Sequence, residues 1–346
     1  MIRRGLLARG RITLLSIGLL ASAALPAWAQ KTDVVTLLNG DRFTCEVELL
    51  EQGRLKVSTD NLGTVYAEWD KIASVVAART FQVETTDGLL LIGQLTSPRP
   101  GSLDVVTLEG TVAVQMYSVV YIAPIGRSFW SKLDGSLDLG VSYTQSSGVA
   151  QVNLSSSVTF RRPNLQMTVS GSNYFTHQED ENTSRQTLQF SSSQSFHGNS
   201  LWLVMGGFES NQELGYDLRS SAGGGIGHYL VRSNRAIFAV GGGLSVNKEL
   251  PVDAEGVENL DAFFSVRQSY FTYDYPKTNM TMLLDVFPSL SQWGRLRLEF
   301  NGSVKREIIR DFTVGLTIYD SYDNKPPTAE SRKNDVGFSL TAGWTF

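Results

Sequence analysis

The chain has 346 residues, of which 18% are charged and 10% aromatic, with 34 acidic residues against 30 basic ones and one cysteine. The acidic balance argues against nucleic acid as a partner, and a single cysteine excludes a disulfide within the chain. After the first 30 residues no apolar run reaches the roughly 18 residues of a membrane-crossing helix, which excludes a protein built from such helices.

The first 29 residues have the organisation of a secretory signal peptide. Four arginines among the first 11 residues precede an apolar run over residues 12–25, and Ala27-Trp28-Ala29 forms an A-x-A cleavage site. A retained membrane helix is the alternative, but the run is shorter than the roughly 20 residues that span a bilayer, and Pro26 closes it. Cleavage after Ala29 would leave 26 basic residues and a formal charge of -8.

Residues 30–127 are predicted to form a periplasmic domain in which a small β-unit occurs twice. Short strands are expected over residues 34–38, 43–50, 54–58 and 64–69, with a hairpin turn at Asn39-Gly40. The pattern recurs after 47 or 48 residues, so that Asn39-Gly40 matches Asp87-Gly88 and Gly63-Thr64-Val65 matches Gly110-Thr111-Val112. Such a repeat is typical of paired small SH3-like or Sm-like barrels.

The aromatic residues and the cysteine of this domain are better explained by packing than by ligand binding. Cys45 alternates with Phe43 and Val47 in an apolar strand pattern, which predicts a core residue; a reactive thiol is the alternative. Trp69, Tyr66 and Tyr117 are expected to pack in the core or at a sheet edge, although a ligand platform remains open.

Residues 130–346 are predicted to form an antiparallel transmembrane β-barrel of about twelve strands. Apolar and small polar residues alternate in long segments, as in a strand with lipid on one side and water on the other. The twelve segments are residues 133–143, 152–160, 165–175, 188–196, 201–208, 218–230, 236–246, 260–272, 280–288, 296–304, 312–318 and 336–346. Ten or fourteen strands remain possible, because boundaries from one sequence are uncertain by a few residues.

The connections between these segments fall into two alternating classes. Short turns such as Arg161–Asn164 and Arg232–Asn234 suit the periplasmic end, while longer, more acidic segments such as Asn247–Asn259 suit the cell surface. An even strand count places both ends of the barrel, and therefore the N-terminal domain, in the periplasm.

The last strand carries an aromatic C-terminal pattern. Phe338, Leu340, Trp344 and Phe346 share its apolar face, which predicts a signal for the barrel-assembly machinery and an outer-membrane location in contact with lipid.

The start of this region resembles a known family. Phe129-Trp130 followed by Gly135-Ser136-Leu137, Ser142-Tyr143-Thr144 and Ser147-Gly148 is similar to the opening of the salt-induced outer-membrane protein family, a domain of unknown function. The resemblance covers about residues 130–346, but Val149-Ala150 replaces the usual Asn-Thr. It implies an outer-membrane β-barrel and links the chain to salt or osmotic stress, without a defined activity.

The polar face of the segment at 296–304 and its flanks carries four charges that such a barrel would place inside. Eight residues are candidates to line its lumen: Asp134, Asp138, Arg267, Asp285, Arg295, Arg297, Glu299 and Lys305. They could border a narrow aqueous passage or pair across the lumen and fill it, and we expect a mostly filled lumen.

No residue pattern predicts catalysis, a cofactor or a metal. The histidines are His177, His197 and His228, of which His177 at the outer rim is the best candidate for a lipid-modifying enzyme. The acidic segments 179–181 and 253–258 could attract divalent cations, but lack the spacing of a calcium loop.

The sequence therefore favours a non-enzymatic outer-membrane barrel with limited permeability or a role in envelope or osmotic stress. A periplasmic tether that binds peptidoglycan or an envelope protein is the first alternative. An outer-leaflet lipid-modifying enzyme is the second.

Overall fold

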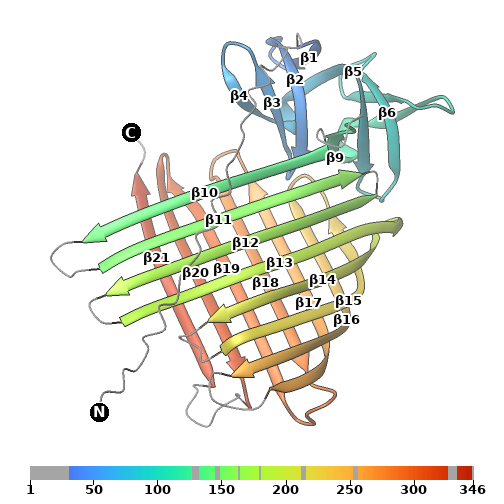
Figure 1. The fold of residues 1–346 in the computed structure, drawn as a ribbon. Coiled ribbons are helices and arrows are strands. Elements are labelled where there is room, and N and C mark those ends of the chain that lie inside the picture. The colour runs from blue at the N-terminus through green and yellow to red at the C-terminus, as the bar shows by residue number, and fades with distance from the viewer. Residues whose placement is uncertain are drawn as a thin grey trace, which may run out of the picture. The chain divides into compact units, whose positions relative to one another are not determined.

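The computed structural model describes residues 31–126, 132–144, 149–162, 164–178, 181–211, 216–251, 256–325 and 333–344. The expected signal peptide, Phe129-Trp130 and Phe346 lie outside these residues. Residues 31–346 form one compact unit that contains two antiparallel sheets (Figure 1). Among the described residues, no helix has the length and apolarity needed to cross a membrane.

The first sheet has nine short strands and two 3-10 turns. The strands are β1 (Asp33–Leu37), β2 (Arg42–Glu51), β3 (Arg54–Thr59), β4 (Gly63–Glu68), β5 (Ile72–Thr85), β6 (Leu90–Thr96), β7 (Ser102–Val106), β8 (Thr111–Gln115) and β9 (Val119–Pro124). The turn η1 (Trp69–Lys71) precedes β5 and the turn η2 (Met116–Ser118) precedes β9. Because β9 pairs with both β2 and β5, the strands β1, β2, β9 and β5 close a small four-stranded barrel.

The sequence repeat appears as matching elements that share one core. The strands β2–β4 and η1 correspond to β6–β8 and η2. Trp69 Nε1 donates to the Met116 carbonyl oxygen at 2.6 Å, so equivalent positions of the two repeats, 47 residues apart, meet directly. Val47 and Leu95, also equivalent, lie in the same buried cluster. The similarity of each unit to an SH3-like or Sm-like barrel stays a prediction.

The packing predictions for this sheet hold in part. Cys45 is fully buried and Trp69 nearly so, which confirms both as core residues. Tyr66 lies on the edge strand β4, with the Arg54 guanidinium 4.6 Å from its ring centroid. The prediction is wrong for Tyr117, whose side chain is largely exposed because η2 turns it away from the core.

The second sheet confirms the twelve predicted strands, in sequence order. They are β10 (Leu133–Thr144), β11 (Val149–Arg162), β12 (Leu165–Gln178), β13 (Glu181–His197), β14 (Ser200–Asn211), β15 (Tyr216–Arg232), β16 (Ala236–Pro251), β17 (Val257–Thr272), β18 (Thr278–Pro288), β19 (Leu296–Ile309), β20 (Phe312–Asp323) and β21 (Asn334–Trp344). Short connections follow β11, β13, β15, β17 and β19; we call this the turn end of the sheet, and the opposite end the loop end.

The strands extend further toward the loop end than the apolar alternation indicated. The segment Asn247–Asn259 was expected to be a loop, but β16 continues to Pro251 and β17 starts at Val257. Asn247 pairs with Asn259, and Glu249 with Val257. The prediction was wrong here because backbone pairing continues where both faces of the strands become polar.

The sheet separates its side chains by face. Leu137 on β10 and Phe338 on β21 are 72% and 80% exposed on the apolar face. On the polar face, Arg297 of β19 reaches Asp261 of β17, two strands away. Since neighbouring strands lie about 4.8 Å apart, such contacts form across the concave side of a curved sheet.

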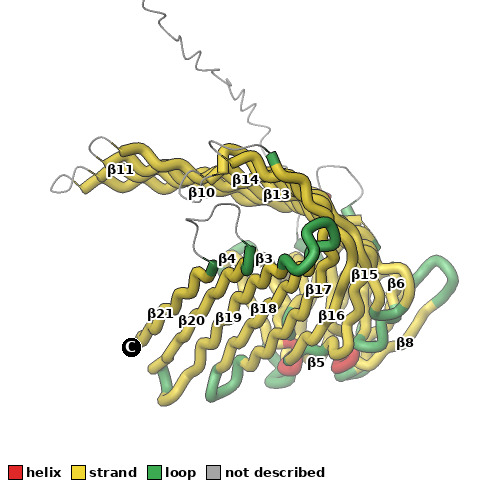
Figure 2. The backbone as a smooth tube through the Cα atoms, turned by 90° about the horizontal axis from the view of Figure 1, so that it is seen from below, coloured by secondary structure: helices red, strands yellow, loops and turns green. Residues whose placement is uncertain are grey.

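Figure 2 shows the sheet bending around β14–β16, so that the strands β10 and β21 both lie on the side away from the bend. Glycines permit this bend: a Cβ at Gly225 would lie 2.2 Å from the Gly242 carbonyl oxygen, and one at Gly243 would lie 2.1 Å from that of Gly224. Among the described residues β10 and β21 are not paired with each other, so they are the two edges of the sheet. Phe338, Leu340 and Trp344 are exposed on one of these edges.

Candidate functional site

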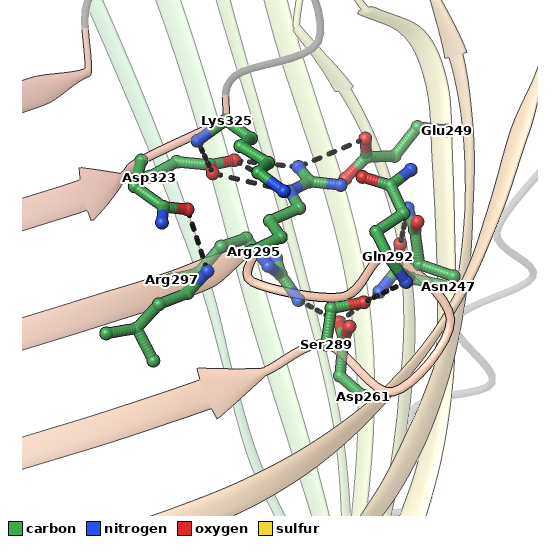
Figure 3. A network of polar contacts seen from close by, with 12 residues as sticks. Asn247, Glu249, Asp261, Ser289, Gln292, Arg295, Arg297, Asp323 and Lys325 are labelled. Carbon is green, nitrogen blue, oxygen red and sulfur yellow. Dashed lines mark hydrogen bonds and ion pairs between the residues drawn. The ribbon is translucent and has the colours of Figure 1, made fainter.

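A buried polar network lies on the concave polar face near the loop end (Figure 3). Its residues come from five strands and the loop between β18 and β19. They are Arg219, Asn247, Glu249, Asn259, Asp261, Ser289, Gln292, Arg295, Arg297 and Asp323.

Arg295 is the centre of one half of the network. Its Nη2 lies 2.7 Å from Asp323 Oδ2 and 3.6 Å from Glu249 Oε2, and its Nε donates to Asp323 Oδ2 at 3.2 Å. Arg219 Nε approaches Glu249 Oε1 at 3.7 Å. One arginine therefore connects β20 to β16, and a second extends the chain of charges to β15.

Arg297 organises the other half. Its Nη2 donates to Asp261 Oδ2 at 2.7 Å, and the guanidinium carbon lies 5.0 Å from the Phe287 ring centroid. Asn247 Nδ2 donates to the same carboxylate oxygen at 2.8 Å, and Asn259 Nδ2 donates to Asn247 Oδ1 at 3.1 Å. This half joins β16, β17 and β19 through a single carboxylate.

The loop between β18 and β19 is folded back against these side chains. Leu290 N donates to the Leu260 carbonyl oxygen at 2.7 Å, and the Arg295 carbonyl oxygen accepts from Ser289 N at 2.9 Å. Lys325 Nζ donates to the Trp293 carbonyl oxygen at 2.7 Å. The loop is thus attached to its neighbours on both sides, which holds Arg295 in place.

Charge in the network is balanced. Arg219, Arg295 and Arg297 face the carboxylates of Glu249, Asp261 and Asp323, and all except Arg219 and Asp323 are buried. Burying ions costs several kcal/mol each unless each is paired, and removing one partner is strongly destabilising. Glu249 Oε1 and Asn259 Oδ1 have no hydrogen-bond partner, so two buried oxygens of the network remain under-satisfied.

The structure distributes the eight predicted lining residues along the polar face. Arg295 and Arg297 belong to the network. Asp134 pairs with Arg161 at 3.0 Å near the turn end, and Asp285 stands opposite Glu299 in the register of β18 and β19. The other three, Asp138, Arg267 and Lys305, are exposed to solvent. Whether these residues line a closed lumen stays a prediction.

Sequence analysis missed the anionic partners of the two arginines. Glu249 and Asp323 lie in segments that were expected to be loops. Asp261 falls in a predicted strand, at even spacing from Arg267, so alternation alone could have placed it on the polar face. The contacts between non-neighbouring strands depend on curvature, for which the sequence offers no direct measure.

The histidines are dispersed. His177 lies on β12 opposite Asn182 of β13. His228 Nδ1 lies 2.9 Å from Ser200 Oγ, a cross-strand pair that sequence spacing did not reveal. A serine hydrolase also needs a third group that orients the histidine, and the described residues place none in a hydrogen bond with His228.

Within the described part of the chain, no three His, Cys, Asp or Glu side chains are grouped as metal ligands. The proposed cation-attracting residues Glu179, Asp180, Asp253 and Glu255 lie outside that part. Glu258 pairs with Lys248 at 2.7 Å.

One comparison with known proteins gave a match. The sequence model of a family described as a protein of unknown function, DUF481, matches residues 137–346, which is nearly all of the twelve-stranded sheet. No curated protein and no solved structure shows significant similarity to the chain.

Proposed function

This chain belongs to the DUF481 family, and we propose that it is a non-enzymatic outer-membrane β-barrel protein of limited permeability. In this proposal the twelve-stranded sheet closes by pairing β10 with β21, and the apolar face contacts lipid. The nine-stranded sheet then lies in the periplasm. A role in envelope or osmotic stress rests on the resemblance to salt-induced outer-membrane proteins.

The observation that carries the proposal is the exposed apolar face. Five large apolar side chains of this face are each more than half exposed: Leu137, Leu139, Phe264, Phe338 and Leu340. Soluble monomers rarely expose contiguous apolar patches larger than a few hundred Å². A strand-wide alternation of apolar and polar residues is the pattern of a barrel with lipid outside and water inside.

The buried network supports limited permeability. Arg295 and Arg297 connect β16, β17, β19 and β20 across the concave face, where the lumen of a closed barrel would lie. Charges that neutralise one another within a lumen obstruct it, whereas unpaired charges would line a passage. The network would therefore narrow the barrel near its loop end.

Conductance in planar bilayers tests this function. We expect low conductance from the intact protein and several-fold higher conductance from the Arg295→Gln/Arg297→Gln variant, because the ion pairs that bridge the strands are lost. Lys305→Gln is the matched control, since Lys305 lies exposed on the same face of β19. No conductance from any of the three proteins, at every salt concentration and voltage, would refute the channel. Equal conductance above zero in all three would refute the role of the network in narrowing it.

The two edges of the nine-stranded sheet favour a tether as a second candidate. The strands β4 and β8 each pair on one side only, and an unpaired edge can accept a strand of another protein. The full-length protein would then retain an envelope protein or peptidoglycan in a pull-down. Ala113→Pro on β8 should abolish retention by removing an outward-facing backbone donor, while Ala113→Ser should keep it.

A further inference from the structure

We propose that the N-terminal β-domain is a cap docked on the turn end of the twelve-stranded sheet, where it narrows the passage a second time. The inference rests on the proposed barrel function and adds a device to it. Its evidence is a set of contacts within the compact unit of residues 31–346.

Three successive turns of the large sheet donate hydrogen bonds to the backbone of the small one. Asn199 Nδ2 donates to the Thr86 carbonyl oxygen at 3.0 Å, and Asn234 Nδ2 donates to that of Val119 at 2.8 Å. Tyr273 OH donates to the Gln52 carbonyl oxygen at 2.8 Å. Directional bonds from three separate hairpins fix one orientation of the domain better than apolar contact would.

Charged side chains reinforce the same contact. Arg232 pairs with Glu84, with only 16% and 11% of the two side chains exposed. The Lys71–Asp274 and Arg235–Asp70 pairs, at 3.3 Å and 3.4 Å, are exposed and add little. Arg232–Glu84 is therefore the ion pair on which docking depends most.

The end of β11 takes part through Arg161, which lines one cavity together with Tyr121 of β9. Burial raises the pKa of Tyr121 to about 12, as expected for a phenol enclosed by the contact. Two cavities lie between the domain and the turn end. One of about 170 Å³ is lined by Gln82, Glu84 and Arg232 among others, and one of about 770 Å³ is lined by Trp69, Asn234 and Tyr273 among others.

Two glycines show how closely the turns approach the domain. A Cβ at Gly53 would lie 2.4 Å from the Asn234 carbonyl oxygen, and one at Gly88 would lie 2.3 Å from the Gly198 carbonyl carbon. Both glycines have positive φ, and no side chain could occupy either position without displacing the opposing backbone.

The internal repeat supplies an undocked counterpart for each of these glycines. Gly88 corresponds to Gly40 and Gly53 to Gly101, 48 residues apart in both cases. Gly40 and Gly101 also have positive φ, but a Cβ at either would meet nothing within 4 Å. Each repeat thus docks through a different turn, and the equivalent turn of the other repeat stays free.

The cap covers the turn end only in part. Hydrogen bonds and ion pairs to the domain come from the turns after β13, β15 and β17, while the described residues show none between the turn after β19 and the domain. A docked domain therefore narrows the passage at the turn end without sealing it. Conductance through the barrel remains measurable while the domain is docked.

The experiment compares two double variants of the full-length protein in the Arg295→Gln/Arg297→Gln background. One is Gly53→Ala/Gly88→Ala, which strains the backbone and obstructs docking. The other is Gly40→Ala/Gly101→Ala, which imposes similar backbone strain at undocked positions. Amide hydrogen exchange of residues 197–201 and 232–236 reports docking, and single-channel conductance in planar bilayers reports the passage.

We expect the docked-glycine variant to exchange at least ten-fold faster in both segments and to conduct several-fold more than its parent, with the free-glycine variant matching the parent in both. Equal exchange in the two variants would overturn the docking. Faster exchange without a conductance increase, in a parent that conducts, would overturn the narrowing and leave the proposed function intact. A parent that does not conduct would refute the channel itself, and the narrowing with it.

Discussion

In the nine-stranded sheet Phe81 is fully buried, whereas Phe338 of the twelve-stranded sheet is 80% exposed. The first sheet gathers its apolar side chains into one enclosed cluster, with Arg79 and most other charges at the surface. The second sheet reverses this order, with apolar side chains outward and a buried charge network on its concave face. The first sheet therefore buries its apolar side chains, whereas the second exposes them, which is the arrangement that the proposed barrel requires.

The largest expected effect removes a core side chain from the first sheet. Phe81→Ala should lower the free energy of unfolding of the N-terminal domain by about 3–5 kcal/mol, since a cavity replaces a buried ring. Urea denaturation of the full-length protein, followed by hydrogen exchange in residues 31–125, measures it. Leu108→Ala, at a fully exposed position, should have almost no effect; a comparable loss there would contradict the enclosed core.

In the second sheet the buried side chain whose removal should cost the most stability is a charged one, Arg297. Arg297→Leu should destabilise the folded sheet by about 3–5 kcal/mol, because Asp261 remains buried and unpaired. The Arg297→Leu/Asp261→Leu double variant should recover most of this loss, as measured by urea unfolding in lipid vesicles. Arg267→Leu, exposed on the same face, is the control and should change stability by under about 0.5 kcal/mol.

A smaller effect tests the medium around the apolar face. Phe338→Arg should make the free energy of folding into lipid vesicles less favourable by about 2–4 kcal/mol if this position lies near the bilayer midplane, because a charge would face hydrocarbon. Ser339→Arg places the same charge at the neighbouring residue, which lies on the polar face of β21. This variant should fold like the unmodified protein. If both variants fold equally well, the two faces do not differ in surroundings.

The smallest effect concerns Cys45, whose pKa burial raises from 9.0 to about 11. The unfolded chain releases this proton near pH 9 and the folded chain does not, so the associated stability is complete below pH 9 and declines as pH rises toward 11. The slope should approach about 1.4 kcal/mol per pH unit.

Urea midpoints of the intact protein and of Cys45→Ala between pH 8 and pH 11 measure this dependence, and the variant should show the flatter curve. Tyr121, with its pKa raised to about 12, contributes with the same sign at higher pH in both proteins. Identical curves would mean that the Cys45 thiol is accessible to solvent.

Much of this molecule follows from local pattern. The alternation of Leu137, Leu139 and Val141 with small polar residues was sufficient to predict the strand β10, and the same rule located all twelve strands. The 48-residue spacing of Gly40 and Gly88 was sufficient to predict matching turns. These features depend on neighbours along the chain or on side-chain parity, both of which the sequence states directly.

Other features depend on which distant residues meet, and only the tertiary structure decided them. The curvature of the sheet brings Arg297 to Asp261 and Arg295 to Glu249 across intervening strands. Docking distinguishes Gly88 from Gly40 although their local sequences and φ angles are similar. The local conformational preference is the same for Gly40 and Gly88. The difference in docking between them arises from surfaces that other parts of the chain contribute.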